Sequence, residues 1–176
     1  MSNTLNYTKN NLILDGFAYP YQEEVKFCKD MKTAPNQQKN HSFSIYDFKA
    51  ITPNSPKALK DALKDAPVIA GIRAGSLTFK NYAGGIIDSA NCTSKFKNHD
   101  KPDHAVLIIG WGETIYGQGY FNVKNSFGKH WGESGYAKIS SNNLQAEEGT
   151  CGIFTDLWQP VINKSRTDET KYSPIE

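Results

Sequence analysis

The feature that most constrains the fold is a pair of strand-length segments joined by a short polar loop. Residues 103–110 form an apolar run with His104 near its start and a glycine at its end, as expected for a buried strand. Residues 119–124 alternate between apolar and polar side chains, which predicts a second strand. The polar loop 113–118 then makes an antiparallel hairpin. The start of its first strand and the end of its second share one sheet edge, so His104 and Asn125 are predicted to be neighbours.

A histidine beside an asparagine has a specific chemical use. A thiol becomes a strong nucleophile only as the thiolate, and a nearby imidazole must take its proton. A side-chain amide oxygen that accepts from the other ring nitrogen orients that imidazole. His104 would be the base and Asn125 the orienting group. Taken singly, either residue is more often a turn residue or a satisfied hydrogen-bonding group at a strand end.

The motifs around these two residues make the pattern specific. Asp103-His104-Ala105, the string Lys124–Gly128 and the string Trp131–Tyr136 resemble the histidine and asparagine half of the papain-like, cathepsin-type cysteine peptidases. Further landmarks follow in the family's order at Tyr19–Tyr21, Tyr82–Ile86 and Cys151–Ile153, so the resemblance runs from about Leu5 to Pro160. It implies an α+β fold that consists mostly of the antiparallel, barrel-like right domain. We expect a remnant of the helical left domain at 1–46, the barrel-like lobe at 47–162 and a polar C-terminal extension at 163–176.

The same resemblance implies roles for individual residues. His104 and Asn125 would be catalytic, and an aromatic shield over their contact would come from Phe127, where the family usually has a tryptophan, and Trp131. The positions implied to line the substrate cleft are Gly71, Asp103, Ala105 and Asp156. By the same resemblance, Asp156 stands where family members vary the floor of their main side-chain pocket, and a carboxylate there would accept a basic side chain as well as an apolar one. The alternative for Asp156 is an ordinary solvated aspartate.

The half of the family's site that carries the nucleophile is missing from the sequence. None of the three cysteines, Cys28, Cys92 and Cys151, follows the glutamine-containing string that precedes the family's nucleophile, and the glutamine that donates to the oxyanion is missing with it. We therefore expect this chain alone to be non-catalytic. Three explanations remain open: a second polypeptide completes the peptidase, the chain is a non-catalytic structural or binding subunit, or the sequence is truncated.

An odd number of cysteines leaves one unpaired in an oxidising compartment. By resemblance, Cys92 and Cys151 would form the disulfide of the barrel domain. Cys28 matches a cysteine whose family partner lies upstream, so it would be unpaired here or linked to a partner chain that completes the helical lobe. The alternative is that all three are reduced and buried.

Composition narrows the kinds of partner, compartment and cofactor that remain. The chain has 176 residues, 38% hydrophobic and 22% charged, with a net charge of +2. This is enough for one good core and too little charge to indicate nucleic acid or a membrane surface. No apolar run is long enough to span a bilayer, and the N-terminus has no signal-peptide pattern. The compartment stays open, with a lysosomal or secreted location implied only by resemblance. The remaining histidines lack ligand-spaced partners, so we expect no metal and no organic cofactor.

Two helices can be placed outside the hairpin. Residues 2–11 are predicted to form a short one. Ser55 as the cap, Pro56 at the first position and apolar residues four apart at Leu59 and Leu63 predict a second helix. An apolar strand at 68–72 follows it.

Overall fold

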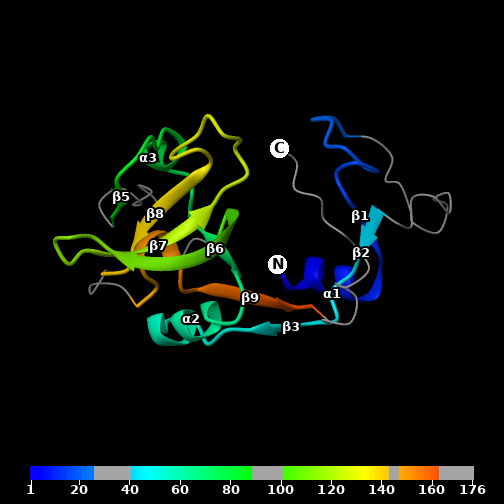
Figure 1. Ribbon diagram of the computed structural model, residues 1–176, viewed down its shortest axis with the longest axis horizontal. Coiled ribbons are helices and arrows are strands. Elements are labelled where there is room, and N and C mark those ends of the chain that lie inside the picture. Colours follow the sequence, from blue (N-terminus) through cyan, green and yellow to red (C-terminus); the bar gives the residue numbers. More distant parts are fainter. Residues whose placement is uncertain (26–40, 89–100, 143–146, 163–176) are drawn as a thin grey trace. The chain divides into compact units, whose positions relative to one another are not determined.

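The predicted hairpin forms the middle of the main sheet (Figure 1). The computed structural model of the chain describes residues 1–25, 41–88, 101–142 and 147–162. Strand β6 spans His104–Glu113 and β7 spans Gly119–Lys124, and they pair antiparallel. The second strand has the predicted bounds, and Phe121 and Val123 are fully buried, as the alternation indicated. The first strand extends to Glu113 because a β-bulge at Ile109 lets its pairing continue past Gly110.

The sheet has seven strands in the order β3-β9-β4-β6-β7-β8-β5. In sequence order, the other five strands are β3 (Asp47–Ala50), β4 (Val68–Ile72), β5 (Ile86–Ile87), β8 (Tyr136–Ser140) and β9 (Asp156–Val161). Strand β4 pairs antiparallel with both β6 and β9, whereas β5 and β8 are parallel. A mostly antiparallel sheet with few helices is the fold expected from the sequence.

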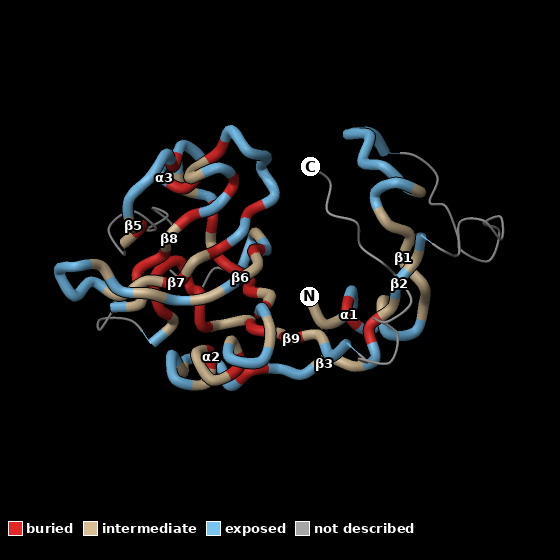
Figure 2. The backbone as a smooth tube through the Cα atoms, in the orientation of Figure 1, coloured by how far each residue is buried: buried red, intermediate tan, exposed pale blue. Residues whose placement is uncertain are grey.

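The core lies along the central strands (Figure 2). Buried side chains of β4, β6, β7 and β8 join Leu59 of helix α2 (Pro56–Leu63) in one apolar cluster. Helix α2 begins as predicted, because the Ser55 hydroxyl accepts from the Ala58 N–H at 3.1 Å and Pro56 occupies the first turn. The short helix α3 (Leu77–Lys80) starts with the same device, in which the Ser76 hydroxyl accepts from the Phe79 N–H. A single turn of 3-10 helix, η2 (Thr150–Gly152), precedes β9.

The described residues divide into two compact units, Met1–Lys49 with the segment from Pro160, and Ala50–Gln159. In the first unit, α1 (Ser2–Asn10) forms where the sequence predicted a helix, and Leu5 is its buried residue. Strands β1 (Ile13–Leu14) and β2 (Ser42–Phe43) pair antiparallel, and Lys9 forms an ion pair with Asp47 at 2.9 Å. The second unit holds both His104 and Asn125.

Candidate active site

His104 is the first residue of β6 and lies opposite Ile72 of β4. The preceding residue anchors this end of the strand. Asp103 donates its N–H to the Ile72 carbonyl at 3.1 Å, and its Oδ1 accepts from the Ala74 N–H at 2.7 Å. Two hydrogen bonds from the adjacent residue therefore fix the backbone from which the imidazole projects.

Asn125 follows the last residue of β7, and the structure brings its side chain to His104. The distance from His104 Nε2 to Asn125 Oδ1 is 2.8 Å, and the same Oδ1 accepts from the Ser126 N–H at 2.8 Å. A backbone N–H can only donate, so the amide atom that faces it is the oxygen. Nε2 must then carry the proton that it shares with Asn125, and in the neutral ring this leaves Nδ1 as the free lone pair.

The Asn125 side chain is held firmly but not completely satisfied. The backbone N–H of Asn125 donates to the Gly135 carbonyl at 2.9 Å, and the residue is only 9% exposed. Its Nδ2 is buried and has no hydrogen-bond partner in the part of the chain that the structure describes. The site therefore presents one buried donor beside the histidine.

Aromatic rings surround the histidine. The Phe127 ring lies 5.0 Å from the imidazole between centroids, and Phe79 contacts the imidazole edge-on at 5.9 Å. Trp131 packs against both phenylalanines and donates its indole N–H to the Phe79 carbonyl at 3.0 Å. Phe127 is 46% exposed whereas Phe79 is fully buried, so the wall faces solvent on one side and is rigidly supported on the other. Phe79 was not among the residues expected from the sequence, although Ser76, three residues earlier, is a capping signal for its helix.

A polar network supports the far side of this wall. The Tyr82 ring packs on Trp131 at 5.3 Å, and its hydroxyl donates to the Gly85 carbonyl at 2.6 Å. Glu133 pairs with Lys138 at 2.6 Å. The hydrogen bond between them lowers the pKa of Glu133 and raises the pKa of Lys138. Burial raises the pKa of the Tyr82 hydroxyl. This explains physically why the Trp131–Tyr136 string accompanies the histidine: it ties the aromatic wall to β8.

Three of the four positions implied to line a cleft lie in one row across three strands. Gly71 of β4 is opposite Ala105 of β6 on one side and Asp156 of β9 on the other. A Cβ at Gly71 would lie 2.8 Å from Pro102 Cβ and 3.1 Å from Asp156 Oδ2. Only glycine permits this close approach. Asp156 is half-buried and accepts at Oδ1 from the Trp158 indole N–H.

The remaining predicted residues fall partly outside the described chain. Cys151 is buried in η2. Cys28, Cys92 and the extension 163–176 lie outside the described residues. The Cys92–Cys151 bridge and the unpaired state of Cys28 therefore stay predictions. Within the described ranges, no group of three or more His, Cys, Asp or Glu side chains is arranged to hold a metal ion.

The family follows from the comparison with known proteins. The model of the papain family of cysteine proteases matches residues 1–161. The chain belongs to this family. A senescence-specific cysteine protease of Arabidopsis thaliana is 35% identical over 144 residues, which are 82% of this chain and 38% of that protein. Chymopapain of Carica papaya is 30% identical over 157 residues, which are 89% of this chain and 41% of that protein.

Solved structures of the papain family agree with the fold. A cysteine protease from Carica candamarcensis superposes with a TM-score of 0.73 at 28% identity, over 91% of this chain and 67% of that one. Bromelain from Ananas comosus gives a TM-score of 0.71 at 25% identity, over 92% and 67%. The chain thus spans well under half the length of the curated relatives and about two thirds of these solved chains.

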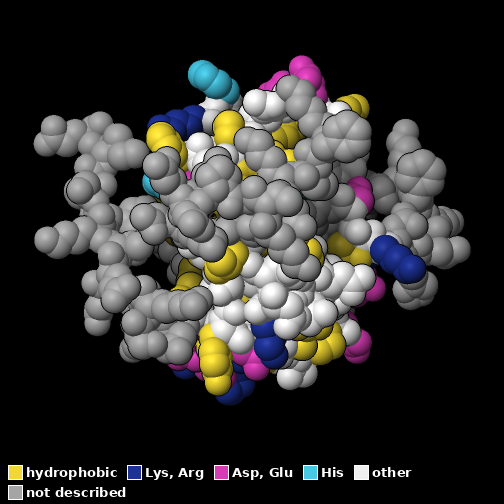
Figure 3. Space-filling view, turned by 90° about the vertical axis from the view of Figure 1, so that its right-hand side faces the viewer, with side chains coloured by type: hydrophobic (Ala, Val, Ile, Leu, Met, Phe, Trp, Pro, Cys, Tyr) yellow, Lys and Arg dark blue, Asp and Glu magenta, His cyan; other side chains and the backbone are white. Residues whose placement is uncertain are grey.

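Surface charge and helix length are the remaining global features. On the face shown in Figure 3, lysine, arginine, aspartate and glutamate side chains of the described residues are scattered and do not form one basic patch. None of the helices that the structure describes combines the length and apolarity needed to cross a membrane.

Proposed function

We propose that this chain contributes the general base and its orienting amide to a papain-type cysteine peptidase. The observation that carries the proposal is the contact of 2.8 Å between His104 Nε2 and Asn125 Oδ1, because it leaves Nδ1 as the lone pair that a thiol needs. The nucleophilic cysteine and the oxyanion-donating glutamine would come from a segment outside these 176 residues. The substrate would be a peptide bond in a peptide or protein.

The chemistry would run through Nδ1 of His104. It takes the proton of the incoming thiol, and the resulting thiolate attacks the carbonyl carbon of the peptide bond. The imidazolium then gives this proton to the departing amine, which leaves an acyl-enzyme thioester. A water molecule attacks the thioester while Nδ1 takes its proton, and the acid product and the thiol are released. The Asn125 oxygen keeps the ring oriented through each step.

The aromatic wall has a part in the same chemistry. Phe127 and Phe79 cover the imidazole on two sides. An ion pair between thiolate and imidazolium is favoured more strongly where apolar rings exclude water. Phe127 is smaller than a tryptophan and has no indole N–H, so its contribution here is cover alone.

The completing segment is a second polypeptide in our proposal. It would pack against the remnant of the helical lobe, with Cys28 as the site of a covalent link. In an oxidising compartment, either secreted or lysosomal, Cys92 and Cys151 would be paired at the same time.

A competing function is a pseudo-peptidase, which serves as a binding or structural subunit of an assembly. The observation that favours it is that none of the three cysteines has the sequence context of the family's nucleophile. In that case His104 and Asn125 would retain their geometry without turning over a substrate.

One experiment separates the two functions. The full chain is mixed with a polypeptide that carries the amino-terminal third of a related mature peptidase, and hydrolysis of a fluorogenic peptide is followed with uptake of a thiol-directed epoxide probe. We expect the mixture to hydrolyse the peptide and to take up the probe on the added polypeptide. His104→Ala should lower the rate by about 10²–10⁴-fold, and Asn125→Ala by about 10²-fold through misplacement of the ring.

The control is His130→Ala, which removes an exposed histidine. It should leave the rate unchanged. No hydrolysis and no probe uptake from the mixture, or equal rates for His104→Ala and His130→Ala, would reject the peptidase function in favour of the binding subunit.

A further inference from the structure

Trp111 and Glu113 lie near the end of β6, and the β-bulge decides which way they face. Before the bulge, Ile108 points into the core and is fully buried, so strict alternation would turn both residues away from the core. The bulge adds one residue and reverses this, because Trp111 is opposite Phe121, which is also fully buried. Residues directly opposite share a face of the sheet. The bulge therefore places both side chains on the core face.

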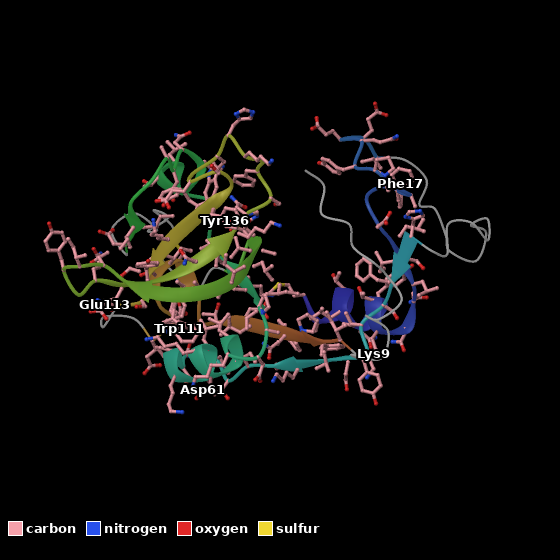
Figure 4. All side chains as sticks on the ribbon, viewed as in Figure 1. Lys9, Phe17, Asp61, Trp111, Glu113 and Tyr136 are labelled. Atoms are coloured by element: carbon pink, nitrogen blue, oxygen red, sulfur yellow. The ribbon has the colours of Figure 1, made fainter. Side chains whose placement is uncertain are left out.

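The core face continues here beyond the packed core and leaves a hollow. Trp111 is 40% exposed and Glu113 is exposed. In Figure 4, Trp111 lies between the sheet and helix α2. The hollow is bounded by these two residues, by Lys60 of α2, and by Ser141 and Asn142 after the end of β8. Its volume of about 290 Å³ is close to the lower end of the range of roughly 300–1,000 Å³ for small-molecule sites, which suits a ligand with a single ring.

Gly119 forms the floor of this hollow. It is opposite Glu113 of β6, and its carbonyl accepts from the Ser141 N–H at 3.0 Å. A Cβ at Gly119 would lie 2.9 Å from Asn142 Oδ1 and closer still to Ser141 Oγ, so only glycine lets these oxygens lie over the backbone. The Ser141 hydroxyl donates to Asn142 Oδ1 at 3.3 Å. This hydrogen bond uses the amide oxygen and leaves the two Nδ2 hydrogens of Asn142 for a ligand.

The other polar groups around the hollow also have unused hydrogen-bonding capacity. Among the residues that the structure describes, none forms an ion pair with Glu113 or Lys60, and none accepts from the Trp111 indole N–H. One carboxylate and one ammonium balance in charge, which favours a neutral ligand. Acceptors and donors stand together, which favours a ligand with several hydroxyl groups. The exposed indole adds a flat apolar surface.

We propose that this hollow binds a neutral pyranose sugar, either as a free monosaccharide or as one unit of a glycan chain. A pyranose ring combines an apolar C–H face, which stacks on Trp111, with hydroxyl groups around its edge. Two adjacent hydroxyls donate to the Glu113 carboxylate, and Lys60 and Asn142 donate to the others. The hollow lies at the opposite end of β6 from His104. The proposal is therefore independent of the proposed function.

Ligand-observed NMR on the full chain tests the proposal with methyl β-D-glucopyranoside, whose equatorial hydroxyls leave the C–H faces of the ring open. Two control compounds separate the contributions: sorbitol has the hydroxyls without a rigid face, and leucine carries both charges without hydroxyls. We expect saturable, millimolar binding of the glucoside, a shift of the Trp111 indole N–H signal, and no saturable binding of either control. Cellotetraose distinguishes the two sources, because tighter binding of the tetrasaccharide indicates a glycan chain and equal binding indicates a free sugar.

Two variants test the named contacts. Trp111→Ala removes the stacking surface and should weaken binding of the glucoside about tenfold. Glu113→Gln keeps the shape and removes the charged acceptor, so it should weaken binding about fivefold at this exposed position. The matched control is Tyr116→Ala, which removes a 90% exposed aromatic side chain from the same hairpin outside the lining of the hollow. It should bind the glucoside as the wild-type chain does.

Three results would overturn the proposal: no saturable binding of the glucoside, equal binding of the glucoside and sorbitol, or tighter binding of leucine than of the glucoside. Unchanged binding in both Trp111→Ala and Glu113→Gln would also overturn it, because the sugar would then bind elsewhere. Failure of the completed mixture to hydrolyse peptides would reject the proposed function and leave these binding results unaffected.

Discussion

Gln159→Glu is the most informative single substitution for the scaffold of the site. Gln159 lies in β9, is 2% exposed, and donates from Nε2 to the carbonyls of Ala62 at 2.8 Å and Ala66 at 2.6 Å. Ala62 lies in the last turn of helix α2 and Ala66 lies just beyond its end, in the region where C=O groups run out of helical partners. One buried amide therefore caps the helix and ties it to the strand that carries Asp156.

The magnitude follows from the geometry. Glutamate has nearly the same shape, but its ionised form only accepts hydrogen bonds and would face two carbonyl oxygens. A buried charge that is left without a partner costs about 3–5 kcal/mol. We expect a loss of that size at pH 7, out of a typical total of about 5–15 kcal/mol. It should be measured as the free energy of unfolding in urea.

The pH dependence has a definite sign. Burial disfavours the ionised form, so the folded-state pKa of the introduced carboxyl lies above its unfolded value of about 4.3. The folded state then binds more protons, and the loss of stability shrinks as pH falls from 7 toward the unfolded value. The recovery is partial, because a protonated carboxyl donates one hydrogen bond where the amide donates two.

The matched control is Gln118→Glu, the same change at an exposed residue of the β6–β7 loop. It should alter stability by less than about 0.5 kcal/mol. Equal stability of the two variants at pH 7, or a loss at Gln159 that does not shrink on acidification, would refute the capping argument. Should Gln159→Glu not fold at pH 7, Gln159→Leu provides the test, with an expected loss of about 2 kcal/mol because each of the two hydrogen bonds contributes about 1 kcal/mol.

Three further substitutions test other contacts. Trp131→Phe loses the indole hydrogen bond to the Phe79 carbonyl and should cost about 1–2 kcal/mol in urea unfolding; an unchanged midpoint would contradict the support assigned to it. Asp61, on α2 in Figure 4, has its pKa lowered from 3.8 to about 2 by two lysines. The stabilisation that the ionised carboxylate provides is present above pH 3.8 and is lost as pH falls toward 2. Asp61→Asn should therefore flatten the dependence of the unfolding free energy on pH in that window, and an unaltered dependence would count against the pairing. Gly71→Ala places a Cβ 2.8 Å from the Pro102 ring and should cost about 1–3 kcal/mol of stability. The control is Gly110→Ala, whose Cβ would have no atom within 4 Å and should not clash. Equal thermal midpoints of the two variants would exclude the clash at Gly71.

Local signals predicted the central hairpin and helix α2. The apolar run from His104 and the alternation up to Lys124 fix which residues face the core, and hydrophobic burial along two neighbouring strands leaves one register that buries both sets. The Ser55 cap and the proline after it are contained within a few residues, so the start of α2 is readable from sequence alone. Since the hairpin was predictable, so was the meeting of His104 and Asn125.

The sequence by itself determined the fold class, the family and the pair of residues at the sheet edge, because each depends on patterns within short stretches. Only the tertiary structure decided which nitrogen of His104 carries the proton, since that depends on the Ser126 N–H and on the 2.8 Å contact. It also decided that Phe79 packs on the imidazole and that Trp158 holds Asp156 over Gly71. These contacts depend on the strand order β9-β4-β6, which joins residues far apart in the chain through long-range pairing that no local propensity specifies.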